Sequence, residues 1–353
     1  MSLGSNNKRR IGRFNPDRHN RPSKDAITEA EIFRQREPIP EPKAPVTPPP
    51  PYEQKVYKER NKGVFKGKLT EEEALERIEF LNDKITNLVF MFGDVASSKT
   101  TVLSALSTYF RQNYLIVENS DNSEANKNIN QNRNLMKKGR FPKITDANIL
   151  HEYDIACRKS REEDWLNLTF IEMSGEYHRE VSFERSGKLP REVEIYVREN
   201  ELPLVIFLVI GYEELMRIGA YADENIDIDD QDTLTANFIN YLTRHDIVCE
   251  NIGIIITKFD RDKVQEDRLS HIQPKLKETL KQIENISASY KIFPFSVGKV
   301  RSNGWTDGDA LIEQLDLSDC KPIIEWIIEN FEEPQEESSN SLFGRIKRLF
   351  FED

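Results

Sequence analysis

The sequence has few of the residues from which disulfide-linked, metal-built or membrane-spanning proteins are made. Three cysteines are spread far apart among 353 residues, which excludes a disulfide scaffold and a Cys-rich zinc site and favours a reducing compartment. The five histidines show no metal-ligand spacing. No apolar run approaches the roughly 18 residues of a membrane-spanning helix, and the first residues lack the apolar segment of a signal peptide. We therefore expect a cytoplasmic protein.

Large apolar residues are also scarce, and the charges are unevenly distributed. Hydrophobic residues make up 37% of the chain, and even with the 15 glycines the total stays below the roughly 45–50% of typical globular domains. The net charge of −11 argues against nucleic acid as a partner. Residues 1–68, however, hold 16 Lys and Arg against 8 Asp and Glu, a net of +8, so the remainder, with 34 against 53, carries −19.

The first 68 residues have the composition of a disordered basic arm. They contain 10 of the 17 prolines and show no helical or strand periodicity. Such a segment cannot bury enough surface to offset the entropy that ordering costs, and its proline-rich part favours polyproline II. We expect either a simple tether or a docking segment for a protein partner or for the acidic remainder of the chain.

Residues 69–333 are predicted to form one α/β domain. Apolar runs and alternation predict strands at 87–92, 151–157, 165–171, 204–210, 251–256 and 290–295. Helical periodicity and a capping box at Thr70 and Glu73 predict helices that begin at Thr70 and lie at 100–111, 233–245, 262–285 and 322–331, while 121–138 is helical or irregular. Buried strands between helices indicate a mostly parallel sheet with helices on both faces.

A phosphate-binding loop is predicted between the first strand and the helix that follows it. Backbone N–H groups of such a loop and of the helix N-terminus cradle phosphate, and the strand–loop–helix context is the one that this motif requires. Lys99 is expected to reach the β- and γ-phosphates, and Thr100 to ligate Mg²⁺. Ser98 replaces the glycine of G-x-x-x-x-G-K-[ST], and serine is small enough for the loop to close. The residues assigned to the loop are Gly93, Asp94, Val95, Ala96, Ser97, Ser98, Lys99, Thr100 and Thr101.

A second motif, E-x-x-G-E, runs from Glu172 to Glu176 at the end of a predicted strand. P-loop GTPases carry D-x-x-G at this place, where the acidic residue holds Mg²⁺ through water and the glycine N–H senses the γ-phosphate. Glu172 is one methylene longer than the aspartate, and Gly175 takes the sensing position. Strand-to-turn sequences of this kind are common, so the motif alone is unspecific. It is informative because it follows the predicted phosphate loop in the chain.

Two short motifs that follow the later strands predict binding of a guanine base. Thr257-Lys258-Phe259-Asp260 follows a buried strand and resembles [NT]-K-x-D. The Asp260 carboxylate would accept hydrogen bonds from guanine N1 and N2, a donor edge that adenine lacks, and the Lys258 stem would lie along the base. A loop after the last strand resembles the S-A-x segment whose backbone N–H contacts guanine O6, and it consists of Ser296, Val297 and Gly298.

With these motifs in this order, residues 85–333 resemble TRAFAC-type P-loop GTPases and, more narrowly, bacterial double-GTPase-like domains from conflict and signalling gene clusters. The narrower resemblance rests on G-R-F-P-K-I-T from Gly139 to Thr145, on Gly-Glu at 175–176 and on the last helix, which bears Trp326. It implies an α/β P-loop NTPase fold, binding of GTP and GDP with Mg²⁺, and a switch I segment in which Thr145 ligates the metal.

The resemblance also implies a mechanism. Thr100, Thr145 and Glu172 would form the metal shell, and Lys99 would stabilise charge on the phosphates. Glu176 stands where many relatives place a water-orienting glutamine, and its carboxylate would add negative charge beside the γ-phosphate, so we expect slow intrinsic turnover. No arginine finger is assignable, and we expect solvated positions for the arginines near switch I, Arg133, Arg140, Arg158 and Arg161.

The sequence thus predicts a slow GTPase switch for an unidentified protein partner, and two alternatives stay open. Ser98 and Glu172 favour a non-hydrolysing, nucleotide-gated scaffold, a pseudo-GTPase. The two threonines after Lys99 fit an ATPase of the deviant P-loop partitioning class. Against that, Asp94 stands where this class has its signature lysine, and the guanine motif would be unexplained.

Partner contacts are expected through the N-terminal arm, the switch regions or the C-terminal segment 334–353. The C-terminal segment joins an acidic linker to an amphipathic helix, for which three settings are open: the domain itself, a partner groove or a peripheral membrane surface. Segments 177–201 and 212–232 are expected to be insertions that offer partner surfaces. The acidic run at 223–232 lacks the glycine and terminal glutamate of an EF-hand, so we expect a solvated loop.

Overall fold

The structure is a computed structural model that describes residues 70–118, 123–142, 150–183, 188–201, 203–216, 231–261, 269–301 and 310–332. These residues all belong to one compact unit, Glu59–Asp353. The basic arm, the C-terminal segment 334–353, Thr145 and most of the acidic run lie outside the described residues. The domain boundaries at 68 and 333 therefore stay predictions.

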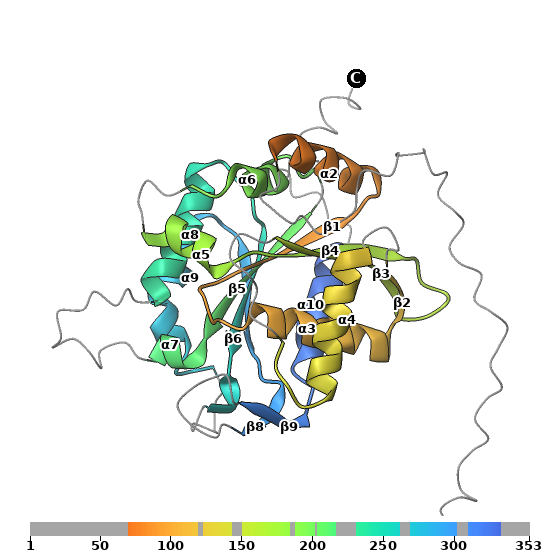
Figure 1. The fold of residues 1–353 in the computed structure, drawn as a ribbon. Coiled ribbons are helices and arrows are strands. Elements are labelled where there is room, and N and C mark those ends of the chain that lie inside the picture. Colours follow the sequence, from red (N-terminus) through yellow and green to blue (C-terminus); the bar gives the residue numbers. More distant parts are fainter. Residues whose placement is uncertain are drawn as a thin grey trace, which may run out of the picture. The chain divides into compact units, whose positions relative to one another are not determined.

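A seven-stranded sheet in the order β2-β3-β4-β1-β5-β6-β7 forms the centre of the domain (Figure 1). Its strands are β1 (Asn87–Phe92), β2 (Leu115–Glu118), β3 (His151–Arg158), β4 (Leu166–Glu172), β5 (Leu204–Gly211), β6 (Asn251–Thr257) and β7 (Ser289–Pro294). β4, β1, β5, β6 and β7 run parallel, and β3 and β2 extend one edge through antiparallel pairing. β5 and β6 are buried along their whole length, which explains their uninterrupted apolar runs.

Helices cover both faces of the sheet, as predicted. They are α2 (Glu71–Asp83), α3 (Lys99–Asn113), α4 (Ser123–Lys137), α5 (Gly175–Phe183), α6 (Arg191–Arg198), α7 (Tyr212–Met216), α8 (Gln231–Arg244), α9 (Lys277–Asn285) and α10 (Cys320–Glu332). One core contains residues of α2, α5, α6, α8 and α9, and the other contains residues of α3, α4 and α10. Successive β1 residues alternate between them: Phe90 belongs to the first core, and Val89 and Met91 belong to the second.

The ends of two helices follow from local chemistry. Thr70 and Glu73 form the predicted capping box at the start of α2. The helix predicted over 262–285 is wrong in extent, because α9 begins only at Lys277, after a 3-10 turn, η2 (Gln273–Leu276). Pro274 in that turn has no N–H for a continuous helical ladder. The N-terminus of α9 is capped by Asp232, whose carboxylate accepts two backbone N–H bonds of 2.8 Å.

Several elements were not predicted. β2 lengthens the sheet edge, and β8 (Gly298–Arg301) and β9 (Leu311–Leu315) form a separate two-stranded hairpin. The isolated bridge Arg140–Leu311 joins that hairpin to the end of the α4 region. The segment 177–201 contributes most of α5 and all of α6, whose residues Val181 and Tyr196 are buried in the core. This segment is therefore a structural part of the domain.

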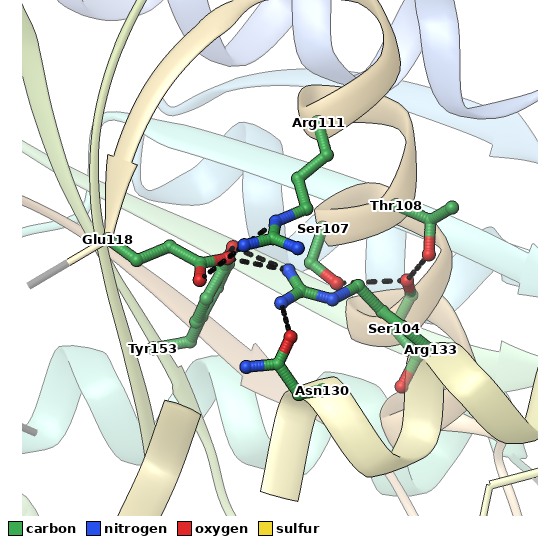
Figure 2. A network of polar contacts seen from close by, with 8 residues as sticks. All are labelled: Ser104, Ser107, Thr108, Arg111, Glu118, Asn130, Arg133 and Tyr153. Carbon is green, nitrogen blue, oxygen red and sulfur yellow. Dashed lines mark hydrogen bonds and ion pairs between the residues drawn. The ribbon is translucent and has the colours of Figure 1, made fainter. Parts of the chain in front are cut away.

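A polar network joins α3, β2, α4 and β3 (Figure 2). The Glu118 carboxylate accepts hydrogen bonds from Arg133 at 2.7 Å, from Arg111 at 2.9 and 3.0 Å, and from the Tyr153 hydroxyl at 3.0 Å. Burial opposes ionisation of Glu118, but the hydrogen bond and charge of Arg133 and the charge of Arg111 outweigh it and hold the pKa below its ordinary value. Arg133 is 3% exposed, so its predicted solvated position is wrong, and it is engaged in holding α4.

Candidate nucleotide-binding site

The predicted phosphate loop leaves the end of β1 and enters α3. A Cβ on Gly93 would lie 2.2 Å from the Val209 carbonyl oxygen of β5, so this position requires glycine. Ala96 and Ser98 have φ values of 62° and 71°. Ser98 thus occupies the left-handed conformation for which the phosphate-loop pattern specifies glycine, and it does so at a cost in backbone strain. Thr101 lies buried in the first turn of α3.

Lys99 is folded back over this loop. Its Nζ donates to the carbonyl oxygens of Gly93 and Asp94 at 2.8 and 3.0 Å, and the residue is 6% exposed. Burial lowers the Lys99 pKa to about 8, although the negative charges of Glu172 and Asp94 oppose the shift. A desolvated ammonium group at the predicted phosphate loop is suited to bind an anion.

Asp94 ties the loop to its surroundings. Its Oδ1 accepts from the Val95 N–H at 2.6 Å, and its Oδ2 accepts from Gln231 Nε2 at 3.2 Å. The backbone of Gly175 lies directly against the same loop, because a Cβ there would approach Val95 N to 2.3 Å. The phosphate loop and the second motif are therefore in contact, as a γ-phosphate sensor requires.

The predicted metal ligands Thr100 and Glu172 also meet. The Thr100 hydroxyl donates to Glu172 Oε1, and Glu172 is 1% exposed. A hydroxyl and a carboxylate are oxygen donors of the kind that Mg²⁺ takes together with phosphates and waters. Within the described part of the chain, no three His, Cys, Asp or Glu residues are placed to hold a metal without such help. Glu176 is exposed in the first turn of α5.

The guanine-type motif contacts the phosphate loop. The Thr257 hydroxyl donates to the Ser97 carbonyl oxygen at 2.9 Å and to the Ile210 carbonyl oxygen at 3.3 Å. Thr257 is 1% exposed, so threonine here serves as a buried bridge between the two motifs. The following residue, Lys258, has a φ of 56°, and Asp260 lies exposed in the 3-10 turn η1 (Phe259–Arg261).

The last predicted loop lies beside this motif. The Phe259 N–H donates to the Phe295 carbonyl oxygen at 3.2 Å, which places Ser296 next to η1. The Ser296 N–H and hydroxyl both donate to Asp319 Oδ2, at 2.9 and 3.2 Å. After it, Val297 is buried and Gly298 has a φ of 100°, which favours glycine at that position.

The fold thus brings the four described motifs to one edge of the sheet, where β1, β4, β6 and β7 end. Thr145 is the one predicted ligand outside the described residues. Sequence reasoning missed Gln231, Glu214 and Asp319, which contact Asp94, Lys258 and Ser296 respectively. None of the three stands in a recognisable motif, and only the tertiary contacts reveal them.

Comparisons with known proteins find solved structures that are similar to this chain at low sequence identity. No protein-family model and no curated protein matches the sequence. The Ski7 GTPase-like domain of S. cerevisiae, bound to GTP, is similar with a TM-score of 0.38 and 17% identity over 73% of this chain and 53% of that chain. A GTP-binding protein of Sulfolobus solfataricus in complex with GDP has a TM-score of 0.27 and 13% identity over 62% and 51%. The chain spans about half the length of these solved chains.

The sheet order and the loop between β1 and α3 define the class to which the fold belongs. A mostly parallel sheet with helices on both faces and a phosphate loop at the carboxyl end of its central strand is an α/β P-loop NTPase fold. Among the described helices, none has the length and apolarity to cross a membrane.

Proposed function

We propose that this protein binds guanine nucleotides and acts as a slow GTPase switch for a protein partner. The observation that carries the proposal is the hydrogen bond from Thr257 to the Ser97 carbonyl oxygen, which joins the guanine-type motif to the phosphate loop across 160 residues. Base and phosphate subsites at one edge of the sheet are what a single nucleotide requires. Asp260 would read the guanine edge, and Lys99 would bind the phosphates.

Thr100 and Glu172 are the described residues that would hold Mg²⁺. Thr145, outside the described residues, is the third expected ligand. A bound metal would supply positive charge that offsets the negative charge developing on the phosphates during transfer. The contact between Gly175 and the backbone at Asp94 and Val95 would carry the switch, since a γ-phosphate in this loop changes what the start of α5 packs against. The carboxylate of Glu176 supports slow turnover.

A non-hydrolysing scaffold is the second candidate, and one observation favours it. The Val95 N–H donates to the side chain of Asp94, so one donor of the phosphate loop is already engaged. A phosphate must compete with this carboxylate and with its negative charge. A triphosphate held less firmly would be positioned less well for attack by water, so binding would gate a partner without cleavage.

Nucleotide titration tests the proposal. Fluorescent GDP, GTP and ATP analogues are titrated with and without Mg²⁺ into the wild type, Lys99→Ala, and Lys281→Ala, an exposed lysine of α9 as the matched control. We expect guanine preference and a loss of about 10- to 100-fold for Lys99→Ala only, the usual effect of removing charge-assisted hydrogen bonds. ATP preference would contradict the guanine assignment. Binding without phosphate release in a single-turnover assay would favour the scaffold.

A further inference from the structure

The short helix α7 lies directly against the guanine-type motif. It follows β5, and its first residue, Tyr212, packs its ring on that of Phe259 with centroids 5.5 Å apart and an interplanar angle of 71°. A Cβ on Gly211 would lie 1.9 Å from Glu214 Oε2, so the glycine leaves the space into which the Glu214 carboxylate folds. The fold thus holds a carboxylate beside η1.

That carboxylate is paired with the lysine of the motif. Lys258 Nζ lies 3.3 Å from Glu214 Oε1, and the two side chains are 16% and 28% exposed. The second carboxylate oxygen, Oε2, is buried and has no hydrogen-bond partner among the described residues. Within the described part of the chain, Lys258 is the cation that pairs with Glu214. Partial burial makes this pair stronger than an exposed one, since solvent screens it less.

A long lysine side chain has many rotamers, and restricting it to one of them costs conformational entropy. An ion pair that already holds the ammonium group in the unliganded protein removes part of that cost before a ligand arrives. Lys258 also starts from a left-handed backbone position, φ 56°, which directs its side chain differently from that of an extended residue. Backbone and carboxylate together preset where the lysine stem lies.

We propose that Glu214 is a positioning residue for base recognition: its carboxylate holds Lys258 so that the lysine stem lies along the guanine base. This inference rests on the proposed guanine-nucleotide site and adds a determinant that lies outside its motifs. Glu214 acts through Lys258 and touches neither the phosphates nor the metal. Loss of the Glu214 carboxylate should therefore weaken the binding of GDP. The binding of inorganic pyrophosphate, which has no base, should stay unchanged.

A double-mutant cycle with GDP tests this positioning role. Dissociation constants are measured for the wild type, Glu214→Gln, Lys258→Ala and the double variant, with Glu213→Gln, the neighbouring acid on α7, as the matched control. We expect Glu214→Gln to weaken GDP binding about three- to tenfold. In the Lys258→Ala background the same change should have no further effect. Glu214→Asp, which keeps the charge, should retain tighter binding than Glu214→Gln.

The outcomes separate this inference from the proposed function. If the wild type binds GDP and Glu214→Gln binds it equally well, or more tightly, the positioning role is wrong while the guanine site stands. An equal loss with and without Lys258 also overturns it, as does a parallel loss of pyrophosphate binding, because both would indicate a general structural effect. A wild type that binds no guanine nucleotide overturns the proposed function itself. Melting temperatures identify any variant that fails to fold, and Glu214→Ala, which also removes the charge, then replaces Glu214→Gln in the cycle.

Discussion

Ser98 has a left-handed backbone at φ 71°, a conformation that costs a residue with a Cβ roughly 1–2 kcal/mol. The residue also precedes the first turn of α3 without capping it through its side chain. Replacing Ser98 by glycine therefore removes strain and loses no hydrogen bond of the cap.

Ser98→Gly should raise the free energy of unfolding by about 1 kcal/mol, measured by urea denaturation. Ser98→Ala, the control, keeps the Cβ and should give no gain. Equal stabilities of the glycine and alanine variants would show that the strain at this position is negligible. GDP affinity should be retained in Ser98→Gly, since the loop conformation is already that of glycine.

Lys99 should make nucleotide binding depend on pH. Its pKa in the unliganded protein is about 8, and an anion binds the protonated form, so GDP affinity should fall above pH 8 by up to about tenfold per unit. Titrations between about pH 7 and 9 check this, and Lys99→Ala should show a flatter profile. A wild-type profile as flat as that of the variant would contradict the role of Lys99.

The buried charge of Lys99, which favours anion binding, lowers the stability of the unliganded protein. The folded-state pKa of about 8 lies below the ordinary 10.5, so burial of the charged ammonium lowers the stability of the unliganded protein at neutral pH. The cost is fully present below pH 8 and disappears as the pH rises toward 10.5. A bound phosphate would offset this cost.

At the scale of the elements, α4 is held on the sheet edge by Arg133 as well as by apolar contacts (Figure 2). Arg133→Met should lower the free energy of unfolding by about 2–4 kcal/mol, because Glu118 loses its buried partner. Arg111→Met is the matched control, since that side chain is 46% exposed and its loss should cost less than about 1 kcal/mol. Denaturant unfolding compares the two, and equal losses would contradict the distinction by burial.

Local sequence patterns predicted the helices and strands well where the patterns were strong. The capping box at Thr70, the apolar runs of β1, β5 and β6, and the alternating strands β3 and β4 are all present. Prediction failed where local signals conflicted or were weak, as at Pro274, where a helical period continues across a residue that cannot extend the helix. It also missed β8 and β9, two short and partly exposed strands that pair with each other with an irregular register at Lys299 and Val300.

At the scale of the whole molecule, the arm of +8 precedes a remainder of −19. The buried core of the described residues begins in α2, so deleting 1–68 should leave the melting temperature almost unchanged. The deletion should weaken GDP binding several-fold at low salt and little at high salt, because an acidic body repels an anionic ligand and salt screens that repulsion. Dissociation constants at about 20 and 500 mM salt measure this. An equal change at both concentrations would mean that the arm acts by contact.

The sequence by itself determined the fold class and the order of the motifs. Buried parallel strands, phosphate loops and helix caps each depend on the residue types and their spacing within a short segment. Only the tertiary structure decided which residues complete the site. Thr257 bonds the Ser97 carbonyl, Gly175 lies on the backbone of Val95, and Glu214 holds Lys258. These contacts join residues far apart in the chain, and the order of the strands in the sheet, together with the helices that follow them, brings the residues together.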